Sequence, residues 1–497
     1  MSSPISPLDL SFLLSETRNA PQHVSGVMVF HNPGAPAADW TLASLVQRYR
    51  AAKPVAPFNV IPEFPLLGRP RWKQVRDFDM RYHVQHVALP SPGSDAQLDE
   101  LVQQWHSELL DRQRPLFHLT FVEGLEGNRF AIFARIHHSI VDGALAIRRL
   151  LGSLSDDPSA PPLAPLFAAE VSSGPRRTAP VGIASYLSSS ASLLKRKAIA
   201  AGELSGEFWS KVSSRAAGQR SQGSSPFEAP MTPINVPVQY GRAFAHLSLP
   251  SAPLIAAAKS LDGTLNDAVL AMIDDAVARY LEQHGHALSQ PLHALVPVSL
   301  RDANSSESGT KVSGVVCPLG DPGADVWTRL QQTIERMNAA KAKIRGFSKT
   351  AAMDYFVGLY FVAQGLGVAG IRRPIANYTV SNVPGSRVQM YLGGAPLLGV
   401  YPMNVLAVGL GLSVTLVSRA DQLDFGFTSN RTALPDPGEI ATLCRNSFAA
   451  LERGRAAARR TTRRNKTSGP KARSARNRGA VASPTPARVA RKKGRRG

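Results

Sequence analysis

The chain has 497 residues, of which 43% are apolar and 19% charged, with a formal net charge of +21 and two cysteines. This length and apolar content are sufficient for two large domains with full cores. Two cysteines far apart in the sequence exclude a disulfide framework and a cysteine-based zinc site. Because no signal peptide is visible at the start of the sequence, we expect a protein of the reducing cytoplasm.

The positive charge is concentrated near the C-terminal end. Residues 453–497 contain 17 Lys and Arg and neither Asp nor Glu, which leaves +4 on the other 452 residues. With few large apolar residues, this tail cannot bury enough surface to fold and is predicted to be disordered. It could attract an anionic membrane or lipid-droplet surface, bind nucleic acid or act only as a solubilising appendage. The absence of aromatic residues for base stacking favours the anionic surface.

Strand and helix patterns alternate through the first 165 residues. A short apolar strand is predicted at 26–30 and an amphipathic helix at 96–110. Two strands at 117–123 and 129–136 are joined by a glycine-rich turn and predict a hairpin. Apolar residues with helical spacing then predict a helix from 143 to 154.

A proline-rich loop and a polar linker separate this region from a second one with similar patterns. We therefore divide the chain into an N-terminal domain at 1–180, a helical crossover and linker at 181–235, a C-terminal domain at 236–452 and the basic tail at 453–497. Further helices are predicted at 181–216, 265–284, 327–344 and 352–366, and further strands at 243–249, 292–300, 378–381, 412–417 and 423–427.

One uncharged stretch, at 388–418, is long enough to be tested as a membrane span. Glycine, proline and asparagine interrupt it repeatedly. A spanning helix of about 20 residues tolerates such interruptions poorly. The pattern therefore favours buried strands over a transmembrane helix.

A compact acid–base motif follows the strand that ends at residue 136. It reads His137-His138-Ser-Ile-Val-Asp142-Gly143 and leads directly into the predicted helix. A neutral imidazole is well suited to take a proton from an alcohol near pH 7. Taken alone, the motif leaves a catalytic base and a buried, hydrogen-bonded histidine as equal alternatives. A metal site is disfavoured, because adjacent histidines point in different directions on an extended chain and no third ligand is marked.

These seven residues match the HHxxxDG signature of CoA-dependent acyltransferases. From residue 6 to residue 452 the chain further resembles one family in that group, the bacterial-type wax ester synthase/diacylglycerol acyltransferases. Phe117 stands where the family has tryptophan, and Gly309-Thr310 stands where it has Gly-Asn. The matching segments are 6–13, similar to the family's N-terminal strand and turn, 21–26, 110–117 (the Pro-Leu-Trp motif), 264–271 (the Asn-Asp motif), 296–301 and 381–385.

The resemblance implies an α/β fold of two chloramphenicol acetyltransferase-like domains, each a mixed sheet flanked by helices, with a disordered basic tail. It implies transfer of an acyl group from acyl-CoA, a substrate rather than a cofactor, to an acceptor hydroxyl. The expected acceptors are diacylglycerol, giving triacylglycerol, or a long-chain alcohol, giving a wax ester for lipid storage. We therefore expect a cytoplasmic enzyme at the periphery of a membrane or of lipid inclusions.

Two alternatives remain open at this stage. One is a related CoA-dependent transferase with a polyketide or peptide acceptor. The other is a non-catalytic protein that binds a lipid surface or nucleic acid through its basic tail. The sequence contains no Gly-x-Ser-x-Gly motif and no Walker motif, so we expect direct acyl transfer without a covalent acyl-enzyme. We expect neither a metal nor a cofactor.

With the other family motifs present, His138 is predicted to be the general base and His137 a supporting residue. Asp142 could orient the imidazole as in a catalytic triad, but the resemblance favours a structural ion pair that holds the loop. Gly143 is predicted to permit a tight backbone turn.

Two residues of the second domain are further candidates. Asn266 and Asp267 could reach the active site as substrate-binding residues, and the amide of Asn266 could stabilise an oxyanion. A helix N-cap is an equal alternative for this pair.

Overall fold

The computed structural model describes residues 2–33, 41–66, 68–168, 228–299, 312–345 and 374–467. The helices predicted at 181–216 and 352–366, and the tail beyond residue 467, lie outside these residues. Up to Gly454 the chain forms one unit, and the segment from Arg455 is a second one.

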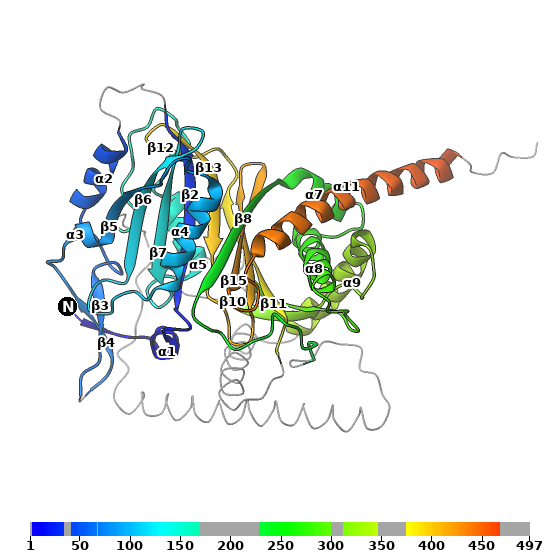
Figure 1. Cartoon of the computed structure of the whole chain (residues 1–497), viewed down its shortest axis with the longest axis horizontal. Coiled ribbons are helices and arrows are strands. Elements are labelled where there is room, and N and C mark those ends of the chain that lie inside the picture. The colour runs from blue at the N-terminus through cyan, green and yellow to red at the C-terminus, as the bar shows by residue number, and fades with distance from the viewer. Residues whose placement is uncertain are drawn as a thin grey trace, which may run out of the picture. The chain divides into compact units, whose positions relative to one another are not determined.

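Six strands form the N-terminal sheet in the order β12-β13-β2-β7-β6-β5 (Figure 1). Neighbouring strands pair antiparallel except β5 and β6, which are parallel. The predicted hairpin at 117–136 is confirmed by the pairing of β6 with β7. The strands are β2 (His23–His31), β5 (Val84–Ala88), β6 (Phe117–Leu125), β7 (Arg129–His137), β12 (Tyr391–Leu392) and β13 (Ala395–Met403).

Helices cover both faces of this sheet, because successive residues of a strand point to opposite sides. On β2, Met28 and Phe30 pack with α2 and α5 in one apolar cluster, whereas Val27 and Val29 pack with α4 in another. The predicted helices at 96–110 and 143–154 are thereby confirmed, with ends a few residues earlier. The helices are α2 (Leu42–Ala51), α4 (Asp95–Ser107) and α5 (Gly143–Leu151).

A second mixed sheet has the order β10-β9-β11-β14-β15-β8. Its central strand β11 runs parallel to both neighbours, and the other pairs are antiparallel. The strands predicted in this region are confirmed. They are β8 (Arg242–Pro250), β9 (His293–Ser299), β10 (Val312–Pro318), β11 (Tyr378–Ser386), β14 (Leu412–Arg419) and β15 (Gln422–Asn430).

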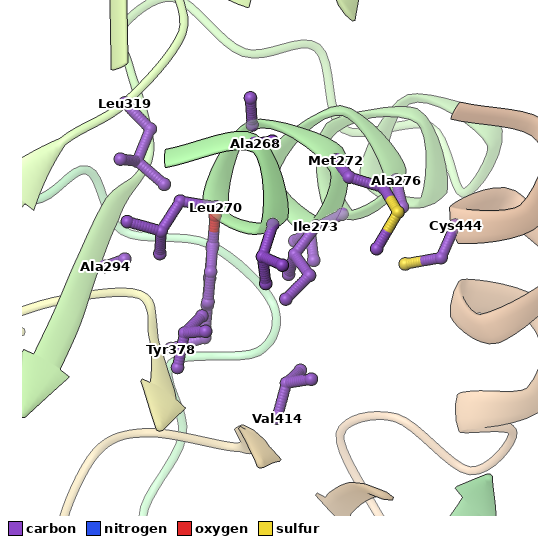
Figure 2. Close-up of a cluster of buried hydrophobic side chains, with 14 of the residues drawn as sticks. Ala268, Leu270, Met272, Ile273, Ala276, Ala294, Leu319, Tyr378, Val414 and Cys444 are labelled. Carbon is purple, nitrogen blue, oxygen red and sulfur yellow. The ribbon is translucent and has the colours of Figure 1, made fainter. Parts of the chain in front are cut away.

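Helix α8 is the centre of the second core. Figure 2 shows its Leu270 and Ile273 turned toward strand residues such as Val414, and Met272 close to Cys444 of α11. Most of α8 is buried, so its apolar residues occupy more than one face. The helices of this region are α7 (Ser251–Lys259), α8 (Leu265–Gln283), α9 (Val326–Arg345) and α11 (Pro437–Thr467).

Two strands from the C-terminal half of the sequence complete the N-terminal sheet. β13 pairs with β2 from Leu397 opposite Phe30 to Met403 opposite Ser25, and β12 pairs with β13. The predicted division at 236–452 assigned both strands to the second domain, and their location is a correction to it. The prediction of buried strands in 388–418 is confirmed, because this stretch forms β12, β13 and β14. No helix in the described part of the chain is both long and apolar enough to cross a bilayer.

A small third sheet, in the order β1-β4-β3, lies beside the first helix. The opening segment, predicted as a strand and turn, instead forms helix α1. Ser6 caps this helix by accepting a hydrogen bond from the Asp9 N–H at 3.1 Å, and Pro7 suits its first turn. The elements of this region are β1 (Ser2–Pro4), α1 (Pro7–Ser15), β3 (Val60–Glu63), β4 (Arg71–Gln74) and α3 (Met80–His83).

Helix α11 extends into the segment predicted to be disordered. That prediction is wrong for residues 453–467, which are helical. Alanine and arginine have high helix propensity, and they continue a helix that is already nucleated by packing.

Candidate active site

The seven-residue motif lies where β7 ends and α5 begins, as predicted. His137 is the last residue of β7, Asp142 is the N-cap of α5, and Gly143 is the first helical residue. The intervening chain makes a turn in which the Ile140 N–H donates to the His137 carbonyl at 3.1 Å. Both imidazoles therefore lie between the end of a buried strand and the start of a helix.

His138 is partly exposed, and its ring stacks on Phe12 of α1 with centroids 4.2 Å apart and planes 21° from parallel. Its backbone N–H donates to the Gln22 carbonyl at 2.8 Å. Burial lowers the pKa of His138, against the opposing effect of the nearby Asp142 carboxylate. The imidazole is therefore neutral near pH 7, which is the form that can accept a proton.

His137 is fully buried and held by its own loop. Its Nδ1 accepts a hydrogen bond from the Ser139 N–H at 3.1 Å, and Ser139 Oγ is 2.7 Å away. In the neutral ring the proton therefore resides on Nε2. That atom lies 3.3 Å from Glu16 Oε1, a close contact without the alignment of a hydrogen bond. These contacts make His137 a packed residue, consistent with a supporting role.

Glu16 is a site residue that the sequence reasoning missed. Its side chain is 2% exposed and accepts hydrogen bonds from Arg112 Nε at 3.1 Å, Arg112 Nη2 at 2.9 Å and the Gln22 N–H at 3.1 Å. Burial raises the pKa of Glu16, but His137, the Gln22 N–H and Arg112 outweigh this effect and leave the pKa below its usual value. The charged carboxylate thus contacts His137 directly. It also accepts a hydrogen bond from Gln22, whose carbonyl accepts the hydrogen bond from the His138 N–H.

The sequence reasoning also missed a group of buried polar residues next to His137. His23 is its cross-strand partner on β2, and His23 Nε2 is 3.1 Å from the His106 carbonyl oxygen. Ser25 Oγ lies 2.9 Å from His106 Nδ1. Burial lowers the pKa of His23 well below its usual value and that of His106 to about 3. These rings therefore stay neutral and serve as packing under the motif.

Asp142 caps a helix, its predicted ion pair stays a prediction, and the role predicted for Gly143 is corrected. Asp142 Oδ1 accepts a hydrogen bond from the Leu145 N–H at 2.8 Å and so caps α5. Gly143 was predicted to permit a tight turn, and this is wrong, since its φ is not positive and it begins a regular helix. A Cβ at this position would meet nothing within 4 Å, so there is open space beside the helix start.

Asn266 and Asp267 lie in the first turn of α8. The Asp267 carboxylate accepts hydrogen bonds from the Thr264 N–H at 2.8 Å and Thr264 Oγ1 at 2.7 Å, which closes a capping box. Since Thr264 is the N-cap, the N-cap alternative for Asn266 is wrong. Asn266 is partly exposed, and its contact with substrate stays a prediction, as does that of Asp267.

Among the described residues we find neither a metal site nor a cysteine nucleophile. Among these residues, no group of three or more His, Cys, Asp and Glu side chains could hold a metal ion. Cys317 and Cys444 are buried, and burial raises the pKa of Cys317 to about 12. A thiol with so high a pKa is not a nucleophile near pH 7.

Comparison with solved structures supports the fold. The first condensation domain of the calcium-dependent antibiotic synthetase superposes with a TM-score of 0.55 at 14% identity, covering 91% of this chain and 96% of that one. This likeness concerns the fold alone. It supports the predicted fold of two chloramphenicol acetyltransferase-like domains.

The family follows from closer relatives. A family model described as the wax ester synthase/diacylglycerol acyltransferase catalytic domain matches residues 5–269, and one for the WS/DGAT C-terminal domain matches 308–452. The probable diacylglycerol O-acyltransferase Tgs4 of Mycobacterium tuberculosis is 32% identical over 93% of this chain and 99% of its own length. The wax ester synthase/diacylglycerol acyltransferase of Marinobacter aquaeolei VT8 superposes with a TM-score of 0.73 at 28% identity, covering 91% of this chain and 100% of that one. The chain belongs to the wax ester synthase/diacylglycerol acyltransferase family and is an O-acyltransferase.

Proposed function

We propose that this enzyme transfers a long-chain acyl group from acyl-CoA to the hydroxyl of diacylglycerol or of a long-chain alcohol. The products are triacylglycerol and wax ester, respectively. The names of the Mycobacterium and Marinobacter relatives support these two acceptor classes, and both relatives align with this chain over nearly their full length.

His138 is proposed as the general base. The observation that carries this role is a partly exposed imidazole whose pKa is lowered by burial and whose plane is set by stacking on Phe12. A base must be unprotonated at the working pH and fixed in orientation to remove a proton as the new bond forms. His138 meets both conditions at the end of β7.

In the proposed reaction, neutral His138 takes the proton of the acceptor hydroxyl while the hydroxyl oxygen attacks the thioester carbonyl carbon. The resulting tetrahedral intermediate carries its negative charge on the former carbonyl oxygen. Its collapse re-forms the carbonyl and breaks the carbon–sulfur bond. The departing CoA thiolate takes the proton from the His138 imidazolium, which releases CoA as a thiol and restores the neutral base.

The neighbouring residues are proposed to position this base. Glu16 and His137 fix the chain on either side of it through buried contacts, and Asp142 holds the start of α5. Asn266 is proposed to donate its amide to the oxyanion, a kind of stabilisation for which one donor is worth about 3 kcal/mol. No metal or cofactor takes part in this scheme.

The proposed site of action is the surface of a membrane or of lipid inclusions in the cytoplasm. The acceptors are insoluble in water and collect at such surfaces. The excess of Lys and Arg in 453–497 supports attraction to an anionic layer. Nucleic acid is the alternative partner of this tail.

The test of function is CoA release from palmitoyl-CoA by the purified protein, with diacylglycerol or hexadecanol offered in separate reactions. Acceptor-dependent release, with the matching ester identified by mass spectrometry, is the expected result. A folded protein that releases no CoA with either acceptor would contradict the proposed substrates. Assays with a polyketide alcohol and with a peptide as the acceptor then test the remaining acceptor classes.

The test of mechanism compares His138→Ala with His31→Ala, an exposed histidine at the far end of β2. His138→Ala is expected to lose most turnover while it retains acyl-CoA binding, because removal of a general base costs about 100- to 10,000-fold in rate. His31→Ala is expected to behave as the wild type. Near-normal turnover in His138→Ala would eliminate this residue as the base.

A truncation separates catalysis by the folded body from a function of the tail. Removal of residues 468–497 leaves all of α11 in place. The truncated protein is expected to keep its turnover with a soluble acceptor. No turnover in either protein, with binding of anionic polymers lost on truncation, would favour the non-catalytic alternative.

A further inference from the structure

The connection between β3 and β4 (Figure 1) exposes large apolar side chains. Phe64 is 47% exposed and Leu66 is 105% exposed. Isolated exposed apolar residues are common on protein surfaces, but two in one turn form a local patch that calls for a partner. We refer to Phe64 and Leu66 together as the apolar tip.

Basic residues follow the apolar tip in the sequence. Residues 60–76 contain four Lys and Arg and one acidic residue, Glu63. Glu63 is already neutralised by Arg71 at 2.5 Å and Lys73 at 3.5 Å, whose side chains are 48% and 58% exposed. The turn therefore combines exposed apolar surface with an excess of positive charge.

The apolar tip connects two strands of the small sheet β1-β4-β3, which is anchored by Trp72. Trp72 of β4 is 6% exposed and packs in the apolar core of the N-terminal domain. It pairs with Pro62 of β3 on one side and with Ser3 of β1 on the other. The strand that follows the turn is therefore anchored in that core.

The small sheet β1-β4-β3 is also connected to helix α1, which contacts the proposed base. The Ile5 N–H donates to the Pro70 carbonyl at 3.1 Å, just before α1 begins. Within α1, Phe12 stacks on His138 while Leu14 is 69% exposed. The end of the turn is thus hydrogen-bonded to the residue that precedes the helix bordering His138.

We propose that the apolar tip inserts into an anionic lipid layer and holds the enzyme on it, with the basic residues of the turn against the lipid headgroups. Apolar side chains that enter the acyl region, flanked by Lys and Arg that contact anionic headgroups, are the combination by which proteins bind membrane interfaces. This inference rests on the proposed function, because the acceptor lipids dissolve in such a layer. It assigns the contact to this turn rather than to the basic tail alone.

The decisive experiment places a fluorescent probe on the tip of the full-length protein. Both native cysteines are buried, so a Leu66→Cys variant can be labelled selectively with an environment-sensitive nitrobenzoxadiazole dye. Labelled Val388→Cys, at a residue that is 52% exposed on another segment, is the matched control. Each is mixed with vesicles of phosphatidylcholine containing phosphatidylglycerol, and with vesicles of phosphatidylcholine alone.

The expected result is a blue shift and increased emission for the label at 66 with anionic vesicles, and quenching by spin-labelled lipid acyl chains. The label at 388 is expected to remain in water. If the protein binds vesicles while the label at 66 stays in water, the tail or another surface makes the contact and the proposal is overturned. Absence of vesicle binding, equal shifts at both sites, or a shift that depends on protein concentration without lipid would each overturn it as well.

A second measurement uses substitution rather than a probe. The double variant Phe64→Ser/Leu66→Ser is expected to weaken the affinity for anionic vesicles about tenfold or more, since two large apolar side chains no longer enter the layer. The control Leu163→Ser/Val388→Ser, which removes two exposed apolar residues elsewhere, should not. An equal effect in both pairs would refute a specific role for the turn.

Turnover of the wild type distinguishes failure of this inference from failure of the proposed function. If the wild type transfers acyl groups but the apolar tip does not enter lipid, only the inference is wrong. If the tip enters lipid but no acceptor is acylated, the proposed acceptors are wrong and the docking surface stands.

Discussion

The substitution Glu16→Gln tests whether a buried carboxylate holds the catalytic motif in place. Glutamine has nearly the same shape as glutamate but carries no charge, and one of its two terminal atoms is a donor. The native oxygens accept from Arg112 Nε and Nη2 and from the Gln22 N–H, and one faces His137 Nε2. In either orientation, the NH2 group of the introduced glutamine would therefore face a neighbouring hydrogen-bond donor instead of an acceptor.

The size of the effect follows from the exposure of the partners. Removing one member of a fully buried ion pair costs about 3–5 kcal/mol. Arg112 is 38% exposed, so water can replace part of the lost contact, whereas Glu16 and His137 are exposed by 2% and 0%. We expect a loss of about 2 kcal/mol in the free energy of unfolding. Because a displacement of about 1 Å at a catalytic group can cost about a hundredfold in rate, kcat should fall between about ten- and a hundredfold.

The assay measures kcat and KM for acyl-CoA, together with the thermal unfolding midpoint, in Glu16→Gln and in the control Glu100→Gln, an exposed glutamate of α4. A fall in kcat with an unchanged KM is the expected signature of a positioning residue. If Glu16→Gln lowers the melting temperature but leaves kcat intact, the carboxylate is a structural support only and the reasoning is refuted.

The pH dependence of stability offers an independent check on the same carboxylate. The pKa of Glu16 is below its usual value, so the folded state binds fewer protons than the unfolded chain. Its contribution to stability is therefore present above the unfolded pKa of about 4.3 and is lost as the pH falls through the folded value. Glu16→Gln should lack this part of the acid destabilisation.

Three further predictions concern other parts of the site and fold. The acid limb of the pH profile of kcat/KM should lie below pH 6.5, because burial lowers the pKa of His138. Asp142→Asn should move this limb to lower pH, because it removes a charge that raises the pKa of His138. An acid limb above pH 6.5 would contradict the assignment of the base. Gly426→Ala should cost about 3 kcal/mol or more in thermal or chemical unfolding, since its Cβ would lie 1.9 Å from the Pro402 backbone oxygen, and a variant as stable as the wild type would show this contact to be adjustable. Gly143→Ala should fold with an unchanged or slightly higher melting temperature, because the position is helical with open space beside it; a large loss of stability would contradict that geometry.

The sequence was sufficient to locate the motif because its environment is local. The strand before His137 and the helix after Gly143 are both visible as short periodic patterns, and their junction fixes where the two histidines lie. Asp142 was predicted to form a structural ion pair, and its capping of α5 was not predicted, although a capping residue acts on the first turn of its own helix. A motif of seven residues cannot specify the tertiary packing that buries His137 and leaves His138 partly exposed.

Glu16 and Phe12 could not be found in this way, because each acts across more than 120 residues of chain. Neither belongs to a periodic pattern that points at the motif. The signal that could have suggested Glu16 is its sequence position between the first helix and the strand that begins at His23, where a lone acidic residue precedes a buried segment. The location of Ala395–Met403 in the N-terminal sheet was hidden for the same reason, since a strand pattern does not name its partner.

The insertion of β13 beside β2 has a consequence for how the protein is made. β2 pairs on its other side with β7, the strand that carries His137, so until residues 395–403 leave the ribosome one edge of that central strand has no neighbour. During most of synthesis the nascent chain must therefore carry an unpaired apolar edge, a state prone to association with other chains. Fragments that end before residue 395 should remain incomplete in the same way, so a prematurely terminated product should be insoluble rather than a working half-enzyme.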